Sequence, residues 1–140
     1  MHNRWAMAAV AWLALILFSS TSIAGERSER AYEWVATTIL HHPPHARGED
    51  WLHFLAAKSV HVTLFTVFAI LLWNALPVLR WKFTLVVLIG LVTGTCSELL
   101  QRLFPNRDPA VRDVLINLAA TLLGATIMWA GTRRALSPKI

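Results

Sequence analysis

The sequence has few charged residues, and this scarcity excludes the most common class of protein. Only 15% of its 140 residues are charged, whereas 56% are hydrophobic. An ordinary water-soluble domain carries about 25% charged residues, and a short chain has a large surface to cover for its volume. So few polar side chains cannot cover a water-facing fold of this size. The sequence therefore predicts one integral membrane domain over residues 1–140.

Cysteine is almost absent, and the basic residues form no continuous patch. The single cysteine, Cys96, excludes an intramolecular disulfide, and its apolar neighbours in the sequence predict that it serves helix packing. Although the formal net charge is +5, the basic residues are spread between apolar runs. This spread disfavours nucleic acid as a partner. In a membrane protein, such residues instead indicate on which side of the membrane each connecting segment lies. No motif indicates a cofactor.

Four apolar runs are long enough to form spanning helices. A helix needs about 20 mainly apolar residues to cross a hydrocarbon core ~30 Å thick. The runs lie at residues 5–23, 51–76, 83–104 and 110–130. The proline-bounded segment 105–109 separates the last two runs, and its Asp108 is predicted to cap the fourth helix. The sequence thus predicts an all-α integral membrane bundle of about four antiparallel transmembrane helices.

The N-terminal run has two interpretations. It is predicted to stay as a first helix, but residues 1–24 also have the basic start, apolar centre and small residues of a cleavable signal peptide. Both interpretations leave residue 25 on the outer side of the membrane. The next segment, 27–40, spaces its apolar residues for a short helix lying on the outer membrane surface.

Three histidines follow this segment, at His41, His42 and His45. Two prolines stand between them, and no cysteine or acidic residue lies at ligand spacing. The pattern is therefore typical of a solvated loop, and the sequence predicts no metal site.

The basic residues favour an orientation with both termini in the cytoplasm. The inner segments then contain six basic residues and no acidic residue, namely Arg4, Arg80, Lys82, Arg133, Arg134 and Lys139. All eight carboxylates fall on or toward the outer side, together with the other seven basic residues. The two basic totals are nearly equal, but the inner residues crowd into short segments, where the orientation rule applies best.

Polar residues inside the predicted spans fall on three stripes. An ionisable group costs roughly 2.5–3.5 kcal/mol at the centre of the bilayer, so its position is informative. Lys58 and His61 lie one turn apart on the second span. The third span carries Gly90, Gly94, Ser97, Glu98 and Gln101, and the fourth carries Asp113, Asn117, Thr121 and Gly124. An antiparallel topology brings the charged ends of all three stripes to one depth near the outer surface, just below Arg107.

These residues are interpreted as a ligand-binding cluster rather than as contacts that hold helices together. Hydrogen bonds between membrane helices contribute only about 0.6 kcal/mol each. This contribution is small compared with the cost of placing four ionised groups in the membrane. The predicted ligand-binding residues are Lys58, His61, Glu98, Gln101, Arg107, Asp113 and Asn117. Lys58 and Arg107 balance the charges of Glu98 and Asp113. Ser97 is expected to pack helices rather than to act as a nucleophile.

The spacing of this cluster resembles the signature of the VanZ-like membrane proteins. That signature runs E-x-x-Q-x-x-x-P-x-R and then D-x-x-x-N, followed by glycines, and it fits Glu98, Gln101, Pro105, Arg107, Asp113, Asn117 and Gly124. Lys58 and His61 resemble the family's upstream lysine–histidine element. The likeness covers about residues 57–125. Two positions depart from the pattern: Ala57 replaces a common aspartate, and Ala120 replaces a common glycine.

The resemblance implies a bacterial envelope protein of the plasma membrane. The family is named for a protein encoded with glycopeptide-resistance genes and associated with teicoplanin resistance. Membrane lipids, including a lipid-linked envelope precursor, are the expected partners. Three functions agree with the sequence. The first is binding of a polar or anionic head group by the cluster. The second is hydrolysis or group transfer on a lipid-linked substrate, with His61, Glu98 and Asp113 as candidate catalytic residues. The third is a structural role in a membrane complex.

Overall fold

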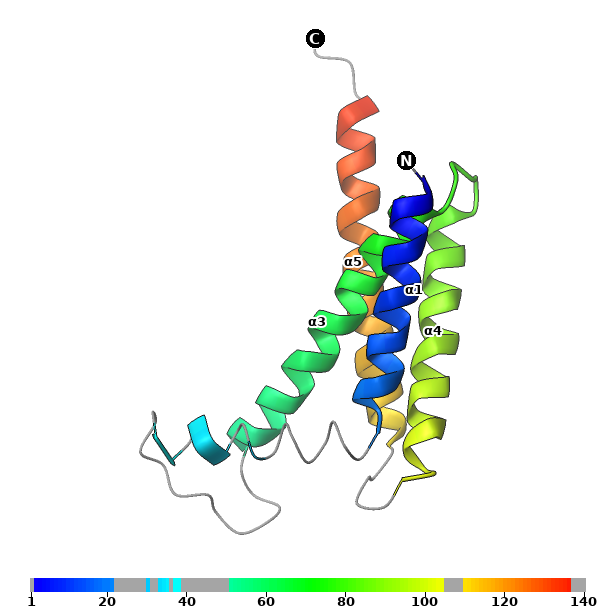
Figure 1. Cartoon of the computed structure of the whole chain (residues 1–140). Coiled ribbons are helices and arrows are strands. Elements are labelled where there is room, and N and C mark those ends of the chain that lie inside the picture. Colours follow the sequence, from blue (N-terminus) through cyan, green and yellow to red (C-terminus); the bar gives the residue numbers. More distant parts are fainter. Residues whose placement is uncertain are drawn as a thin grey trace.

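The described residues form four long helices whose positions agree with the four apolar runs. A computed structural model describes residues 2–21, 30, 33–35, 37–38, 51–104 and 110–136. Within these residues all regular structure is helical: α1 (His2–Ser19), α3 (Trp51–Ala75), α4 (Lys82–Gln101) and α5 (Val111–Leu136) (Figure 1). The predicted all-α membrane bundle is therefore confirmed.

Three of these helices are long and apolar enough to cross a membrane, judged by length and composition. Their apolar spans are Lys58–Ala75, Lys82–Gln101 and Val111–Arg134, and α1 contributes a shorter apolar stretch, Asn3–Ser19. The last helix, α5, continues beyond the predicted end at residue 130. Arg133 and Arg134 occupy its final turn. Cations are favourable there, since they lie against the negative end of the helix dipole.

The first helix ends earlier than its apolar run, at a sequence of hydroxyl-bearing residues. The Oγ of Ser19 donates to the carbonyl of Ile16 at 2.6 Å, and the Oγ of Ser20 donates to the same carbonyl at 3.1 Å. Such side-chain bonds compete with the backbone hydrogen bonds that extend a helix. The chain therefore leaves α1 through a tighter turn, in which the Thr21 N–H donates to the Phe18 carbonyl at 3.0 Å.

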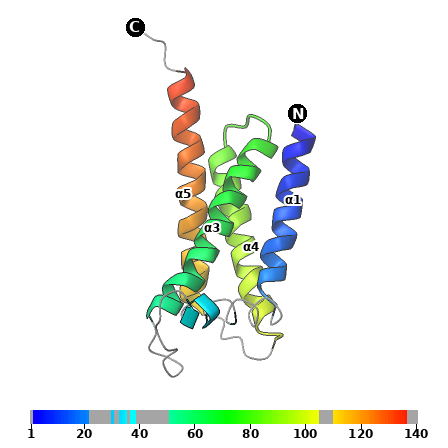
Figure 2. The same ribbon diagram turned by 60° about the vertical axis from the view of Figure 1, so that its left-hand side comes forward.

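The helices alternate in direction, so the bundle has two different ends. The start of α1, the end of α5 and the α3–α4 connection lie at one end, which we call the terminal end (Figures 1 and 2). The end of α4, the start of α5 and the end of α1 lie at the opposite end, which we call the α4–α5 end. The helix α5 extends beyond its neighbours at the terminal end. As a result, α4 runs antiparallel to α5, whereas α3 runs parallel to α5.

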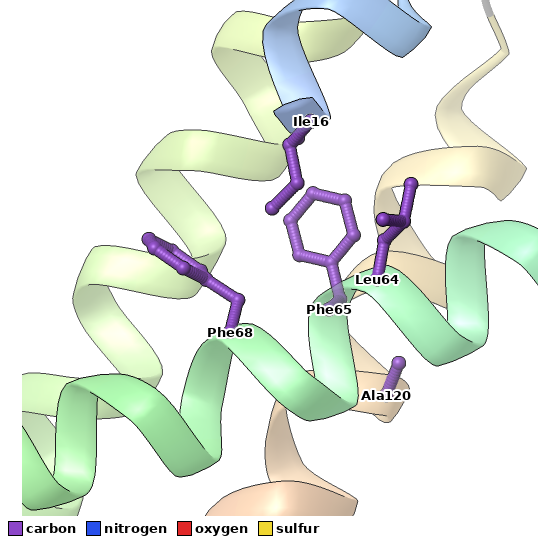
Figure 3. Packing of buried hydrophobic residues seen from close by; sticks show 5 residues of the cluster. All are labelled: Ile16, Leu64, Phe65, Phe68 and Ala120. Atoms are coloured by element: carbon purple, nitrogen blue, oxygen red, sulfur yellow. The ribbon is translucent and has the colours of Figure 1, made fainter. Parts of the chain in front are cut away.

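A cluster of buried apolar side chains joins three of the helices. It consists of Ile16, Leu64, Phe65, Phe68 and Ala120 (Figure 3). The ring of Phe65 is fully buried and points toward Ile16 of α1. The indole N–H of Trp12 also donates to the Leu64 carbonyl at 2.8 Å. The first helix thus packs into the core.

Glycines allow α5 to approach α3 and α4 closely. A Cβ added at Gly124 would lie 2.5 Å from the Thr66 carbonyl oxygen of α3. On α4, a Cβ at Gly90 would collide with the side chain of Thr121, and one at Gly94 would lie 3.2 Å from the Cβ of Asn117. Gly90 and Gly94 thus allow α4 to pack closely against α5.

The segment predicted to form a short outer helix is helical at its described positions. These are Arg30, 33–35 and 37–38, and the Thr37 Oγ1 donates to the Glu33 carbonyl one turn earlier at 2.7 Å. The segment lies at the α4–α5 end of the bundle (cyan in Figures 1 and 2). Its placement on a membrane surface stays a prediction.

The prediction that Cys96 serves helix packing is wrong. Its side chain is exposed, because it lies two residues after Gly94 and two residues before Glu98, and both of those residues are buried. Two residues correspond to about 200° around a helix. Cys96 therefore points away from the bundle.

Candidate functional site

One face of α4 is lined by small and polar residues and is buried in the bundle. Its buried residues include Gly90, Thr93, Gly94, Ser97, Glu98 and Gln101. Only 5% of Glu98 and 6% of Gln101 are exposed. The Gln101 amide Nε2 donates to the Glu98 carboxylate Oε1 at 3.1 Å. The predicted stripe is thus a real inner face, and its polar part lies at the α4–α5 end.

A matching stripe on α5 is buried as well. Asp113, Asn117, Thr121 and Gly124 are all buried. Asp113 occupies the first turn of α5, where a carboxylate is stabilised by the positive end of the helix dipole. The hydroxyl of Thr121 donates to the Asn117 carbonyl at 2.9 Å.

The glycine contacts define how the two stripes align. Gly90 lies opposite Thr121, and Gly94 lies opposite Asn117. Because α4 and α5 are antiparallel, one further turn along each helix brings Glu98 to the level of Asp113. The two buried carboxylates therefore share one level of the bundle, one turn from the neutral amide of Asn117.

The helix α3 supplies a cation at this level of the bundle. The Nζ of Lys58 donates to the Asp113 Oδ2 at 2.6 Å, and the two side chains are 19% and 9% exposed. Because α3 and α5 are parallel, the same alignment also places the Thr66 hydroxyl 3.2 Å from the Ala120 carbonyl, to which it donates. His61 lies one turn beyond Lys58 and is half-buried.

Buried polar atoms without a hydrogen-bond partner among the described residues include the Oδ1 of Asp113 and both amide atoms of Asn117. The Nε of Arg112, on a side chain that is 65% exposed, lies 3.6 Å from the Asp113 Oδ1. Asn117 itself is 0% exposed. Burying a polar group without a hydrogen bond costs about 1–3 kcal/mol, so these atoms call for an explanation.

Some predicted features lie outside the described residues. Arg107 and Asp108 lie within 105–109, and His41, His42 and His45 lie within 39–50. The predicted charge balance depends on Arg107, because the described part of the cluster contains two carboxylates and the single cation Lys58. Among the described residues, no three His, Cys, Asp or Glu side chains come together in a way that could hold a metal ion.

Sequence reasoning missed the contribution of α1. The Oγ atoms of Ser20 and Ser97 lie 2.6 Å apart and share a hydrogen bond, and both side chains are at most 1% exposed. The run of serines at the end of the first apolar stretch was the available signal. This contact confirms that Ser97 packs helices, as expected.

The described residues thus place donors and acceptors of three helices at one end of an apolar bundle. Lys58 of α3 and Asp113 of α5 are in direct contact. Glu98 and Gln101 form a second pair on α4. Asn117 lies at the next level inward. An arrangement of this kind can hold a polar group that carries both charge and hydrogen-bonding atoms.

Comparison with known proteins returned one match. The sequence profile of the VanZ/LLP1 family matches residues 5–132, a range that includes all four helices of the bundle except their outermost residues. No curated protein and no solved structure matches the chain.

Proposed function

The chain belongs to the VanZ/LLP1 family, and from this basis we propose that its polar cluster binds the head group of a membrane lipid. It is a membrane-associated protein, and its family links it to glycopeptide resistance. The proposed ligand-binding residues are Lys58, His61, Glu98, Gln101, Arg107, Asp113 and Asn117. We expect the natural ligand to be a lipid-linked precursor of the cell wall.

One observation supports this proposal most directly: a tight ion pair lies among apolar helices. Lys58 and Asp113 are 2.6 Å apart and mostly buried, and Glu98 is buried at the same level. Removing ions from water costs several kcal/mol each, so a buried ion pair is weak evidence for stability. Ionisable residues within membrane spans instead mark functional sites as a rule.

The position of the cluster suggests which leaflet it serves. It lies at the α4–α5 end, opposite the α3–α4 connection and the end of α5 (Figure 1), and these two segments contain the exposed basic residues Arg80, Arg133 and Arg134. Short basic segments stay in the cytoplasm. We therefore propose that the protein lies in the bacterial plasma membrane with both termini inside, and that the cluster contacts head groups of the outer leaflet.

Lipids that co-purify with the protein test the proposal. Wild-type protein is extracted in mild detergent, and the bound lipids are identified by mass spectrometry. We expect the Lys58→Ala and Arg107→Ala variants to lose at least tenfold of a lipid that the wild type retains, because charged hydrogen bonds contribute about 1.5–3 kcal/mol each.

A matched control removes the same charge from the other end of the bundle. Arg134 is exposed at the terminal end, so the Arg134→Ala variant should retain the lipid in full. Equal lipid content in all four proteins would refute the proposal, and equal loss in all three variants would indicate a general effect of charge.

A further inference from the structure

We infer that the inner part of the cluster is a subsite for a hydroxyl group of the bound head group, formed by Asn117 and the Oδ1 of Asp113. This inference rests on the proposed function and narrows its ligand class. The preferred head group carries a free hydroxyl, as in a glycerol or a sugar, in addition to a phosphate.

The starting observation is the unsatisfied amide of Asn117. The side chain is fully buried, and no described residue forms a hydrogen bond with its Oδ1 or Nδ2. A hydrocarbon environment supplies no water to compensate. Within the same stripe, by contrast, Thr121 satisfies its hydroxyl on the Asn117 carbonyl. The lack of partners is therefore not a general property of the α5 stripe.

The geometry directs this amide toward Asp113. Side chains on a helix tilt toward its N-terminus, and residues four apart lie one above the other. The amide of Asn117 thus points to the level of Asp113, whose Oδ1 also lacks a hydrogen bond from the described residues. On the facing helix, Gly94 presents no side chain, and its missing Cβ would lie 3.6 Å from the Asn117 Nδ2.

The chemistry of these atoms selects the group that fits. The Asp113 carboxylate and the Asn117 Oδ1 are acceptors and require a donor, whereas the Asn117 Nδ2 requires an acceptor. A hydroxyl is donor and acceptor at once, so it can donate to the Asp113 Oδ1 and accept from the Asn117 Nδ2. A phosphodiester has no donor to offer, and its charge is repelled by Asp113 and Glu98. The phosphate of the ligand therefore belongs beside the ammonium of Lys58.

Two lipids of equal charge separate the hydroxyl from the phosphate. Dioleoyl phosphatidylglycerol and dioleoyl phosphatidylethanol are both anionic phosphodiesters, but only the first has free hydroxyls. Their affinities for the full-length protein are measured by native mass spectrometry from detergent micelles. We expect the wild type to bind the glycerol lipid about tenfold more tightly, a difference of about 1.4 kcal/mol.

Variants locate this preference within the bundle. The Asn117→Leu variant keeps the approximate size of the side chain and should bind both lipids equally, because leucine offers no hydrogen bond to a hydroxyl. The Thr121→Val variant removes a hydroxyl one turn deeper on the same stripe and should keep the tenfold preference.

The possible results distinguish the inference from the proposed function. Equal binding of both lipids by the wild type overturns the hydroxyl subsite but leaves head-group binding in place, and this comparison needs no variant to fold. A preference that survives Asn117→Leu also overturns the assignment. If neither lipid binds, the proposed function fails and the subsite fails with it.

Discussion

At the scale of single residues, the pair formed by Lys58 and Asp113 shows how the site depends on the position of a few atoms. The two groups are 55 residues apart in the chain and 2.6 Å apart in space. The pair is partly exposed, so its net effect on stability lies between that of a surface pair and that of a fully buried one. If one partner is removed, the other stays in a poorly hydrated place without its counter-ion.

We therefore expect Lys58→Met and Asp113→Asn each to lower the free energy of unfolding by about 1–3 kcal/mol. The double variant should lose less than the sum of the two, with a coupling of about 1–2 kcal/mol. Unfolding of the wild type, both single variants and the double variant in mixed micelles is monitored by circular dichroism and analysed as a double-mutant cycle. Strictly additive losses would show that the contact contributes nothing to stability.

At the scale of helices, the glycines decide how closely the polar stripes meet. Gly124 of α5 lies against the backbone of α3. Gly90 of α4 lies against the side chain of Thr121 of α5. Close approach holds Lys58 within reach of Asp113 and brings Glu98 to the level of Asp113. Gly131, on the part of α5 that extends past its neighbours, has nothing within 4 Å of an added Cβ.

The same substitution at two glycines of one helix should thus have opposite effects. Gly124→Ala places a methyl group 2.5 Å from the Thr66 carbonyl oxygen, and it should lower stability by about 1–3 kcal/mol through overpacking. Gly131→Ala should raise stability by up to about 1 kcal/mol, since alanine favours a helix. Thermal unfolding in detergent measures both. A neutral Gly124→Ala variant would contradict the close packing of α3 and α5.

At the scale of the whole molecule, the two ends of the bundle carry different kinds of side chain. The carboxylates of the cluster gather at the α4–α5 end. Basic and aromatic residues pair at the terminal end, where the guanidinium of Arg133 lies 4.2 Å from the centre of the Trp129 ring and the Lys82 ammonium lies 5.2 Å from that of Trp73. Such pairs are typical of a membrane–water interface.

This separation predicts the orientation in the cell, which single cysteines can report. In a Cys96→Ser background, Leu103→Cys places a thiol at the α4–α5 end and Val78→Cys places one at the terminal end. Both positions are highly exposed, at 77% and 96%. A membrane-impermeant maleimide applied to intact spheroplasts should label the first within minutes and the second only after lysis. The reverse pattern would place the cluster on the cytoplasmic side and would contradict a role at the outer leaflet.

The amino-acid sequence by itself determined the class of fold and which polar residues lie on the buried faces of α4 and α5. Apolar length marks each helix, and helical periodicity places Glu98 and Gln101 on one buried face and Asp113 and Asn117 on another. Both signals are local, because they depend only on residues within a few turns of each other. The position of the polar residues near one end of each run also predicted that they share a level of the bundle.

Only the tertiary structure decided which of these residues touch. The contact of Lys58 with Asp113, the serine pair between α1 and α4, the unsatisfied amide of Asn117 and the outward position of Cys96 all depend on the rotation and alignment of whole helices. These are set by how side chains distant in sequence fit together at glycines and around Phe65. Local periodicity contains no information on that fit, because many rotations bury the same stripe and only close packing selects one of them.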